Sequence, residues 1–246
     1  MHAAVYAGID PPVVTAGTQV IRHEGWYQLI NPTVKGGAVN EVVLSLLKEG
    51  DVDKKVDETI ALYRQHQLSF TWCIGPMSSP KKLEEKISAL ATSSWEFSGM
   101  AIDCNSDIAT SNALQTEVVD SHNFVDFLSV TTEGWDLKDR TSTEERLKRM
   151  VTHPQYRCFI ARNGDQVIGS AATILKEGHG YLIGGVVLKD YRGKGAYRSL
   201  IQARVEDLQR TGYPFAVTQA RSATAVPILE KLGFQNLFSA RIYCLA

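Results

Sequence analysis

Hydrophobic and polar residues follow two different periodicities along this chain, and these periodicities distinguish strands from helices. Short runs of β-branched, aromatic or alternating apolar residues predict strands at residues 25–30, 68–74, 95–104, 114–119, 156–162, 167–175, 181–188, 215–218 and 238–245. Apolar residues spaced three to four apart predict helices at residues 39–48, 52–66, 81–92, 123–133, 146–153, 194–211 and 224–232. We therefore expect a mixed α/β fold of the α+β type.

Turn and capping residues set several of these boundaries. Ser79 and Pro80 have the residue types of an N-cap and a first helical residue, and residues 142–145 (STEE) predict a capped start for the next helix. Turns at residues 163–165 and 177–178 join three neighbouring strands, which predicts an antiparallel meander.

The helix at residues 194–211 is amphipathic. Leu200, Ile201 and Val205 are expected on its buried face, and Arg204 on its solvated face.

A small, polar stretch at residues 105–113 is the expected linker, and 246 residues are sufficient for two domains. We expect a loosely docked N-terminal arm at residues 1–20, a first domain at residues 21–108 and a second at residues 114–246.

Composition excludes several classes of function. The formal net charge is −1, so no overall basic field is available for nucleic acid. No apolar run reaches the roughly 20 residues of a membrane helix, and we expect a cytoplasmic protein that binds no membrane. The four cysteines lack metal-ligand spacing, so no metal is expected and the thiols should be free.

The strongest chemical signal lies at residues 187–196 (VLKDYRGKGA), where a buried strand turns into a helix. Glycines there permit a sharp turn, and the free N–H groups and dipole of the helix N-terminus favour a bound phosphate. Arg192 and Lys194 add positive charge. The turn follows an antiparallel meander, which disfavours a dinucleotide-binding fold, and it lacks the ending of a nucleotide P-loop.

This stretch resembles the pyrophosphate signature of the GNAT superfamily of N-acetyltransferases: Gln or Arg, two free positions, Gly, one free position, then Gly or Ala. Arg192 and Gly195 match it, and residues 225–234 (AVPILEKLGF) are similar to the family's second signature. The resemblance covers residues 114–246 and implies the GNAT fold, a mostly antiparallel mixed sheet flanked by helices.

The resemblance further implies acetyl-coenzyme A (acetyl-CoA) as co-substrate, without a metal, between the strands at 181–188 and 215–218. The residues that it assigns to the co-substrate are Gly185, Val186, Val187, Arg192, Gly193, Lys194, Gly195, Ala196, Tyr197, Arg198 and Ser222. Tyr197 departs from the signature, which has Gly or Ala at that position, and its side chain would crowd the diphosphate unless it points away. Leu229 stands where the family often has a tyrosine acid, so the usual proton donor is missing.

His179 and Tyr181 are the candidate catalytic groups, each able to act as a base directly or through water. An acidic stretch that includes Glu133, Asp136 and Glu144 would suit a cationic amine, although acids at helix starts also serve as dipole complements.

The first half repeats the strand, helix, strand order of the second signature without a glycine-rich cradle, and Trp26, Trp72 and Trp95 are expected in its core. It is similar to the degenerate half of tandem GNAT proteins, which implies that it shapes the acceptor pocket.

The predicted function is acetyl transfer to a primary amine of a small molecule or peptide by direct attack in a ternary complex. The alternative is a non-catalytic acyl-CoA sensor, and a longer acyl group also remains open. We expect a monomer or homodimer.

Overall fold

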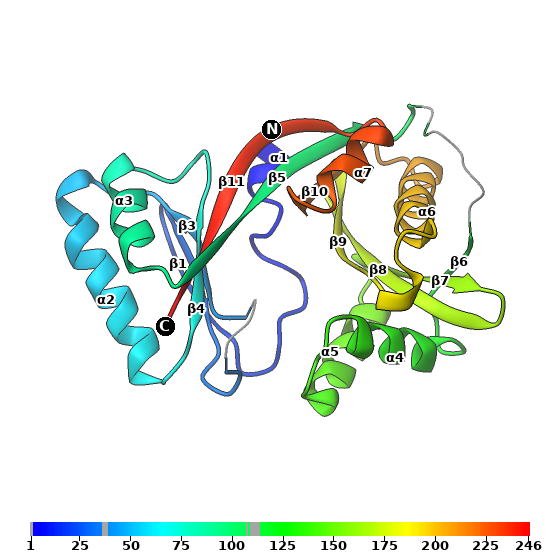
Figure 1. Cartoon of the computed structure of the whole chain (residues 1–246), viewed down its shortest axis with the longest axis horizontal. Coiled ribbons are helices and arrows are strands. Elements are labelled where there is room, and N and C mark those ends of the chain that lie inside the picture. The colour runs from blue at the N-terminus through cyan, green and yellow to red at the C-terminus, as the bar shows by residue number, and fades with distance from the viewer. Residues whose placement is uncertain (1, 36–38, 107, 109–113) are drawn as a thin grey trace.

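The computed structural model describes all residues except 1, 36–38, 107 and 109–113, and the described residues form a single eleven-stranded sheet flanked by helices (Figure 1). The strands are β1 (Gln19–His23), β2 (Trp26–Ile30), β3 (Glu41–Ser45), β4 (Phe70–Ile74), β5 (Ser93–Asp103), β6 (Gln115–Val118), β7 (Tyr156–Asn163), β8 (Gln166–Lys176), β9 (His179–Val187), β10 (Phe215–Arg221) and β11 (Gln235–Leu245). The α-helices are α1 (His2–Val5), α2 (Val52–Gln65), α3 (Lys81–Leu90), α4 (Phe124–Gly134), α5 (Arg140–Thr152), α6 (Ala196–Arg210) and α7 (Val226–Lys231). The predicted mixed, mostly antiparallel sheet is confirmed: among the described strands, β3 with β4 and β9 with β10 are the parallel pairs.

One order of elements occurs twice. In the first half a meander of β1, β2 and β3 leads to α2, β4, α3 and β5, and in the second a meander of β7, β8 and β9 leads to α6, β10, α7 and β11. In each half the two parallel strands are connected by a long helix: α2 connects β3 to β4, and α6 connects β9 to β10. The predicted two-half arrangement is therefore confirmed. None of the described helices combines the length and apolar character needed to cross a bilayer.

The two halves exchange their last strands. The order across the sheet is β1-β2-β3-β4-β11-β5-β10-β9-β8-β7-β6, so β11 pairs with β4 of the first half and β5 pairs with β10 of the second. The two long strands also pair with each other, and a Cβ added at Gly99 would lie 2.0 Å from the ring of Phe238. Most of the expected linker lies outside the described residues. Strand β5, which precedes it, lies between β11 and β10, whereas β6, which follows it, is the outermost strand of the second half.

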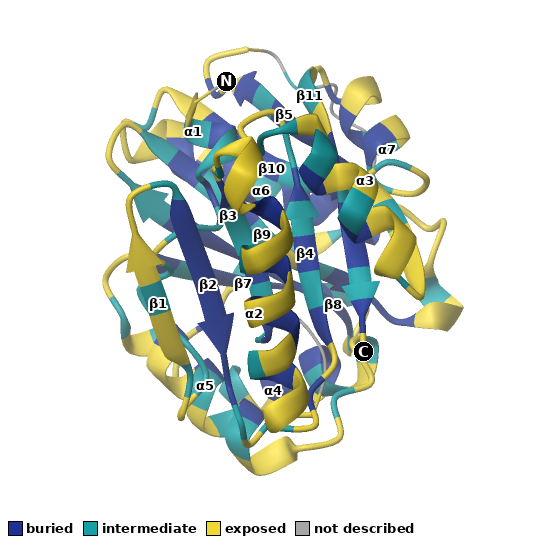
Figure 2. Cartoon of the chain, turned by 90° about the vertical axis from the view of Figure 1, so that its left-hand side faces the viewer, coloured by how far each residue is buried: buried dark blue, intermediate teal, exposed yellow. Residues whose placement is uncertain are grey.

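Helices cover the two halves differently. In the second half α4 and α5 lie on one face of the sheet, and α6 and α7 on the other (Figure 1). In the first half α2 and α3 cover the outer face alone, over the fully buried strand β2 (Figure 2). Trp26 and Trp72 lie in that core at 1% and 0% exposure, as predicted, whereas Trp95 is half-buried on β5 beneath the guanidinium of Arg221.

Three local predictions are wrong. Residues 41–45 form strand β3, because their β-branched run pairs with β2 and β4. Helix α5 starts at Arg140, six residues before the predicted start, and Asp139 caps it by accepting from the Ser142 N–H. Helix α3 is preceded by Pro80 as N-cap residue, without a capping bond from a side chain.

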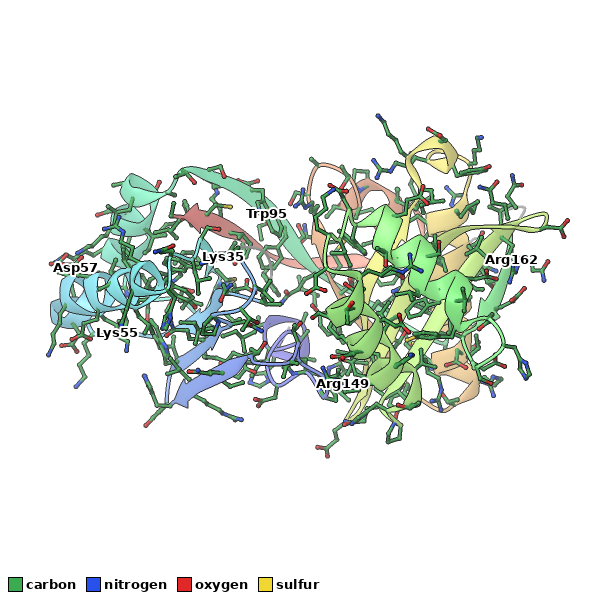
Figure 3. All side chains as sticks on the ribbon, turned by 90° about the horizontal axis from the view of Figure 1, so that it is seen from below. Lys35, Lys55, Asp57, Trp95, Arg149 and Arg162 are labelled. Carbon is green, nitrogen blue, oxygen red and sulfur yellow. The ribbon has the colours of Figure 1, made fainter. Side chains whose placement is uncertain are left out.

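The N-terminal arm is also docked more firmly than expected. Ala4 and Ala7 are buried against Val217 of β10. The Lys176 Nζ donates to the carbonyls of Ala7 and Ile9 at 2.8 Å. Arg149 of α5, labelled in Figure 3, donates to the Val14 carbonyl at 2.8 Å. The arm therefore fills space between the halves.

Candidate functional site

The parallel strands β9 and β10 separate part-way along their length. Their pairing ends at Leu182 and Thr218, and the Thr218 Oγ1 closes the junction by donating to the Leu182 carbonyl at 2.9 Å. Beyond this point a cleft of about 1030 Å³ lies between β9, β10 and the first turn of α6. Strand edges that no longer pair leave backbone groups free for a ligand.

A β-bulge shapes the cleft wall on β9. Between the pairs Ser170–Val186 and Ala172–Ile183, β9 contains two residues, Gly184 and Gly185, opposite one on β8. Gly184 has φ +60° and a Cβ there would meet nothing within 4 Å, so the bulge presents bare backbone to the cleft.

The turn into α6 fits an anionic diphosphate. Gly193 and Gly195 have φ of +78° and +93°, and a Cβ at either position would meet no atom within 4 Å. No side chain caps the first turn of α6 and no acid lies in it, while Arg192 and Arg198 line the same mouth of the cleft. Free N–H groups, the helix dipole and two guanidinium groups together favour bound phosphate.

The corresponding place in the first half does not fit such a ligand. The helical turns that open α2 carry Glu49, Asp51 and Asp53, whose charges repel phosphate. The indole of Trp72 lies in the core beside β3, and its Nε1 donates to the Ser45 Oγ at 3.0 Å. Among the described residues, only the second half forms a phosphate cradle of this kind.

Most residues assigned to the co-substrate line this cleft. They are Gly185, Val186, Val187, Arg192, Gly193, Gly195, Ala196, Tyr197 and Arg198. Two lie outside the lining: the Lys194 Nζ lies 4.8 Å from the Tyr191 ring centroid, and the Ser222 N–H donates to the Glu96 carbonyl. The ring of Tyr197 points toward the bulge, where a Cβ on Gly185 would lie 2.9 Å from it, and so leaves the diphosphate end open.

The two candidate catalytic residues lie in different places. His179 begins β9, four residues before Ile183, in a surface hollow formed with the N-terminal arm, and its Nδ1 lies 3.0 Å from the Glu177 carbonyl. Burial lowers the pKa of His179, but its ring lines neither the cleft nor the cavity described below. Tyr181 lines both, and burial raises the pKa of its phenol, so the hydroxyl stays protonated.

Arg204 is a feature of the cleft that the prediction missed. Instead of facing solvent it is 2% exposed, with Nε donating to the Leu200 carbonyl and Nη1 to the carbonyls of Ala172 and Ile183. Burial lowers the pKa of Arg204 to about 10, which still leaves it charged at neutral pH. Because Ala172 and Ile183 flank the bulge, Arg204 holds the bulge in shape from beneath. Its spacing from Tyr197, Leu200 and Leu208 is that of one helical face, and this signal was in the sequence.

A second cavity of about 220 Å³ lies between the halves. Strands β3, β4, β5 and β11 form one side, β9 and β10 another, and residues of the N-terminal arm cover it. Tyr181 and Gln219 line both this cavity and the cleft, so the two spaces meet at these side chains. Glu41 of β3 also lines the cavity, and burial raises its pKa to about 7.

The acidic stretch has mostly structural contacts. Asp139 caps α5, and Glu144 pairs with Lys148 at 2.6 Å. Asp136 alone of this stretch lies at the cleft, beside Trp135 at the end of α4.

Residues 127–243 match the family model described as an acetyltransferase (GNAT) domain. The second half of the chain is a GNAT domain. This match covers β7 to β10, the phosphate cradle and most of β11.

Solved structures match the whole chain. It is similar to a functionally unknown conserved protein from Staphylococcus epidermidis ATCC 12228, with a TM-score of 0.70 and 15% identity over 98% of this chain and 96% of that one. A GCN5-related N-acetyltransferase from Kribbella flavida matches with a TM-score of 0.69 and 11% identity over 98% and 95%. A tandem GNAT protein from the clavulanic acid biosynthesis pathway matches with a TM-score of 0.63 and 12% identity over 95% and 84%. At these identities the likeness shows the fold, that of a tandem GNAT protein. No curated protein matches the chain.

Proposed function

We propose that this protein transfers an acetyl group from acetyl-CoA to a primary amine by direct attack in a ternary complex. One observation carries the proposal: Tyr181 and Gln219 line both the GNAT cleft and the cavity between the halves. Ligands in these two spaces would lie on either side of the same two side chains, Tyr181 and Gln219. A sensor that binds only an acyl-CoA would need the cleft but not the second cavity.

Acetyl-CoA supplies a thioester whose carbonyl carbon is open to attack by a neutral amine. In the proposed complex the backbone from Gly185 to Val187 pairs with the pantetheine arm, and the turn at Gly193 and Gly195 holds the diphosphate. Arg204 keeps the bulge in place, so the backbone donors near the thioester need no rearrangement. Tyr181, protonated at neutral pH, offers a hydroxyl where the two spaces meet.

Calorimetric titration with acetyl-CoA tests the cleft. Arg192→Glu should weaken binding by about tenfold to a hundredfold, since a charge-assisted contact contributes about 1.5–3 kcal/mol. Arg64→Glu makes the same charge change on the exposed face of α2 and should leave the affinity unchanged. An absence of acetyl-CoA binding by the wild-type protein would refute the proposal.

Release of free thiol separates enzyme from sensor. With acetyl-CoA and a panel of primary amines, the enzyme should release thiol in amounts that match the acetylated amine. Binding of acetyl-CoA without thiol release for every amine would favour the sensor. Parallel titrations with succinyl- and octanoyl-CoA test whether the donor is acetyl.

A further inference from the structure

We propose that Glu41, a residue of the first half, binds the ammonium group of the acceptor and takes its proton, and that the acceptor is a small primary amine with an apolar body. The inference rests on the proposed function and names the acceptor side of the same site.

Strand alternation directs Glu41 into the cavity. Its neighbour Val42 is fully buried in the core beneath α2 and α3, so Glu41 and Val43 face the opposite side of β3. Both line the cavity. Thr71 on β4 is the register partner of Glu41 in the parallel pair.

The repeat of the fold places Glu41 opposite Tyr181. In the first half Glu41 directly precedes the last parallel pair, Val42 with Trp72. In the second half Tyr181 directly precedes the last parallel pair, Leu182 with Thr218. The two residues therefore occupy equivalent positions in the two halves and line one cavity between them. Because Tyr181 also lines the cleft, a ligand held by Glu41 lies next to the space of the acetyl donor.

The charge of the cavity selects a monocation. Among the described residues that line it, Glu41 is the only carboxylate and none is a lysine, arginine or histidine. The structure shows no ion pair of Glu41 within the described part of the chain. One ammonium group would satisfy this carboxylate, whereas a second charge on the ligand would be buried without a partner.

The rest of the cavity lining favours a small apolar group attached to the ammonium of the ligand. Its larger side chains are mostly apolar: Ile9, Leu29, Val43, Met77, Phe97 and Ile242. The volume of about 220 Å³ lies below the roughly 300–1,000 Å³ of sites for drug-sized ligands. This excludes an aminoglycoside or a folded peptide segment and favours an alkyl or arylalkyl amine.

The proton balance of the transfer follows from this placement. Glu41 takes one proton from the ammonium group, and the freed lone pair on nitrogen forms the C–N bond to the acetyl carbonyl carbon. The C–S bond breaks with its electron pair on sulfur, and the second proton lost by nitrogen ends on that sulfur as the thiol. Glu41 then returns its proton to water. The net products are the amide, the free thiol and one proton.

The surroundings of Glu41 suit a base near neutral pH. Burial raises its pKa to about 7, in the range in which a general base works best. The charge of Glu41 acts on three nearby titratable groups, Tyr181, Cys73 and Tyr63. Burial raises the pKa of all three, so they stay neutral. Asp10 of the arm and Arg22 of β1 pair with each other in the outer hollow.

Binding without acetyl-CoA tests the inference apart from activity. Calorimetry on the wild-type chain should show that n-hexylammonium binds at least tenfold more tightly than n-hexanol and than protonated 1,6-diaminohexane. Glu41→Gln should weaken n-hexylammonium binding at least tenfold while acetyl-CoA affinity stays within twofold. Glu145→Gln, an exposed carboxylate on α5, is the matched control and should change neither.

The pH profile distinguishes a base from a structural carboxylate. In the wild-type protein, kcat/KM for the best amine should rise with pH through an inflection that Glu41→Gln removes, together with about a hundredfold loss of kcat/KM. Equal wild-type affinity for the alcohol and the ammonium would overturn the inference, and this comparison needs no variant. Amine binding without acetyl-CoA binding would instead defeat the proposed function and leave the Glu41 site standing.

Discussion

Removal of the Glu41 charge should change how the stability of the unliganded protein depends on pH. Glu41 ionises at about its ordinary pKa of 4.5 in the unfolded chain and at about 7 in the folded protein. The unfolded state therefore releases this proton first as the pH rises. The wild-type protein must lose stability between pH 4.5 and 7, whereas Glu41→Gln has no such proton to lose.

The size of the effect follows from the same two pKa values. The difference between 4.5 and about 7, at 1.36 kcal/mol per pKa unit, corresponds to at most about 3–4 kcal/mol. Below pH 4 the Glu41 side chain is neutral in both the folded and the unfolded state, so the wild type and Glu41→Gln differ little in how their stability depends on pH. Above pH 8 the glutamine variant should be more stable by up to this amount, because the wild-type protein keeps a carboxylate within the cavity.

Urea unfolding at pH 4, 5, 6, 7 and 8, without ligands, measures this difference. The free energy of unfolding of Glu41→Gln minus that of the wild type should grow with pH through pH 7 and begin to level off near pH 8. The exposed control Glu145→Gln should track the wild type at every pH. Parallel curves for the wild type and Glu41→Gln across pH 5–8 would mean that the carboxylate is hydrated as in the unfolded chain, and the pKa argument would fail.

Three further substitutions test the fold and the cleft. Gly99→Ala should lower the free energy of unfolding by about 1–3 kcal/mol in urea, because its Cβ would lie 2.0 Å from the Phe238 ring where the halves exchange strands. Gly185→Ala should weaken acetyl-CoA binding about tenfold in calorimetry, because the new methyl group would meet the Tyr197 ring at 2.9 Å and displace it. Arg204→Met should change the free energy of unfolding by no more than about 2 kcal/mol, since a buried charge leaves with its hydrogen bonds, yet weaken acetyl-CoA binding about tenfold as the bulge loses support.

Each of these substitutions has a matched control. Gly50→Ala adds a methyl group with no atom within 4 Å, so an equal effect there would refute the steric argument at Gly99. The second substitution Tyr197→Ala should restore acetyl-CoA binding to Gly185→Ala if the clash is with that ring. Arg210→Met alters the exposed end of the same helix, and wild-type affinity in Arg204→Met would show that the bulge holds its shape unaided.

Local signals in the sequence were sufficient to predict the phosphate-binding turn of the cleft. The phosphate turn depends on glycine spacing and a helix start within residues 187–196, and the amphipathic α6 follows at once, so neighbouring residues contain what is needed. The run at residues 42–45 was ambiguous because a short apolar stretch suits a buried helix or a strand equally well. Its β-branched content favoured the strand, and pairing with β2 and β4 decided it.

The cavity between the halves could not be predicted in this way, because it depends on contacts between residues far apart in the sequence. Glu41 reads in sequence as a charged residue at the edge of an apolar run. Its place opposite Tyr181, 140 positions later, follows only from the repeat of the fold. The burial of Arg204 was only partly predictable from sequence. Its helical spacing places it on the buried face of α6, but its charge favours the solvated face.

The strand exchange makes both halves contribute to the wall of the cavity between them. Phe97 of β5 and Ala240 and Ile242 of β11 belong to opposite halves, and all three line the cavity between the halves. The C-terminal residues Tyr243 and Leu245 complete the core of the first half. Neither half can therefore form the cavity wall alone. The first half forms no phosphate cradle in its described residues, yet its removal would open the wall of this cavity.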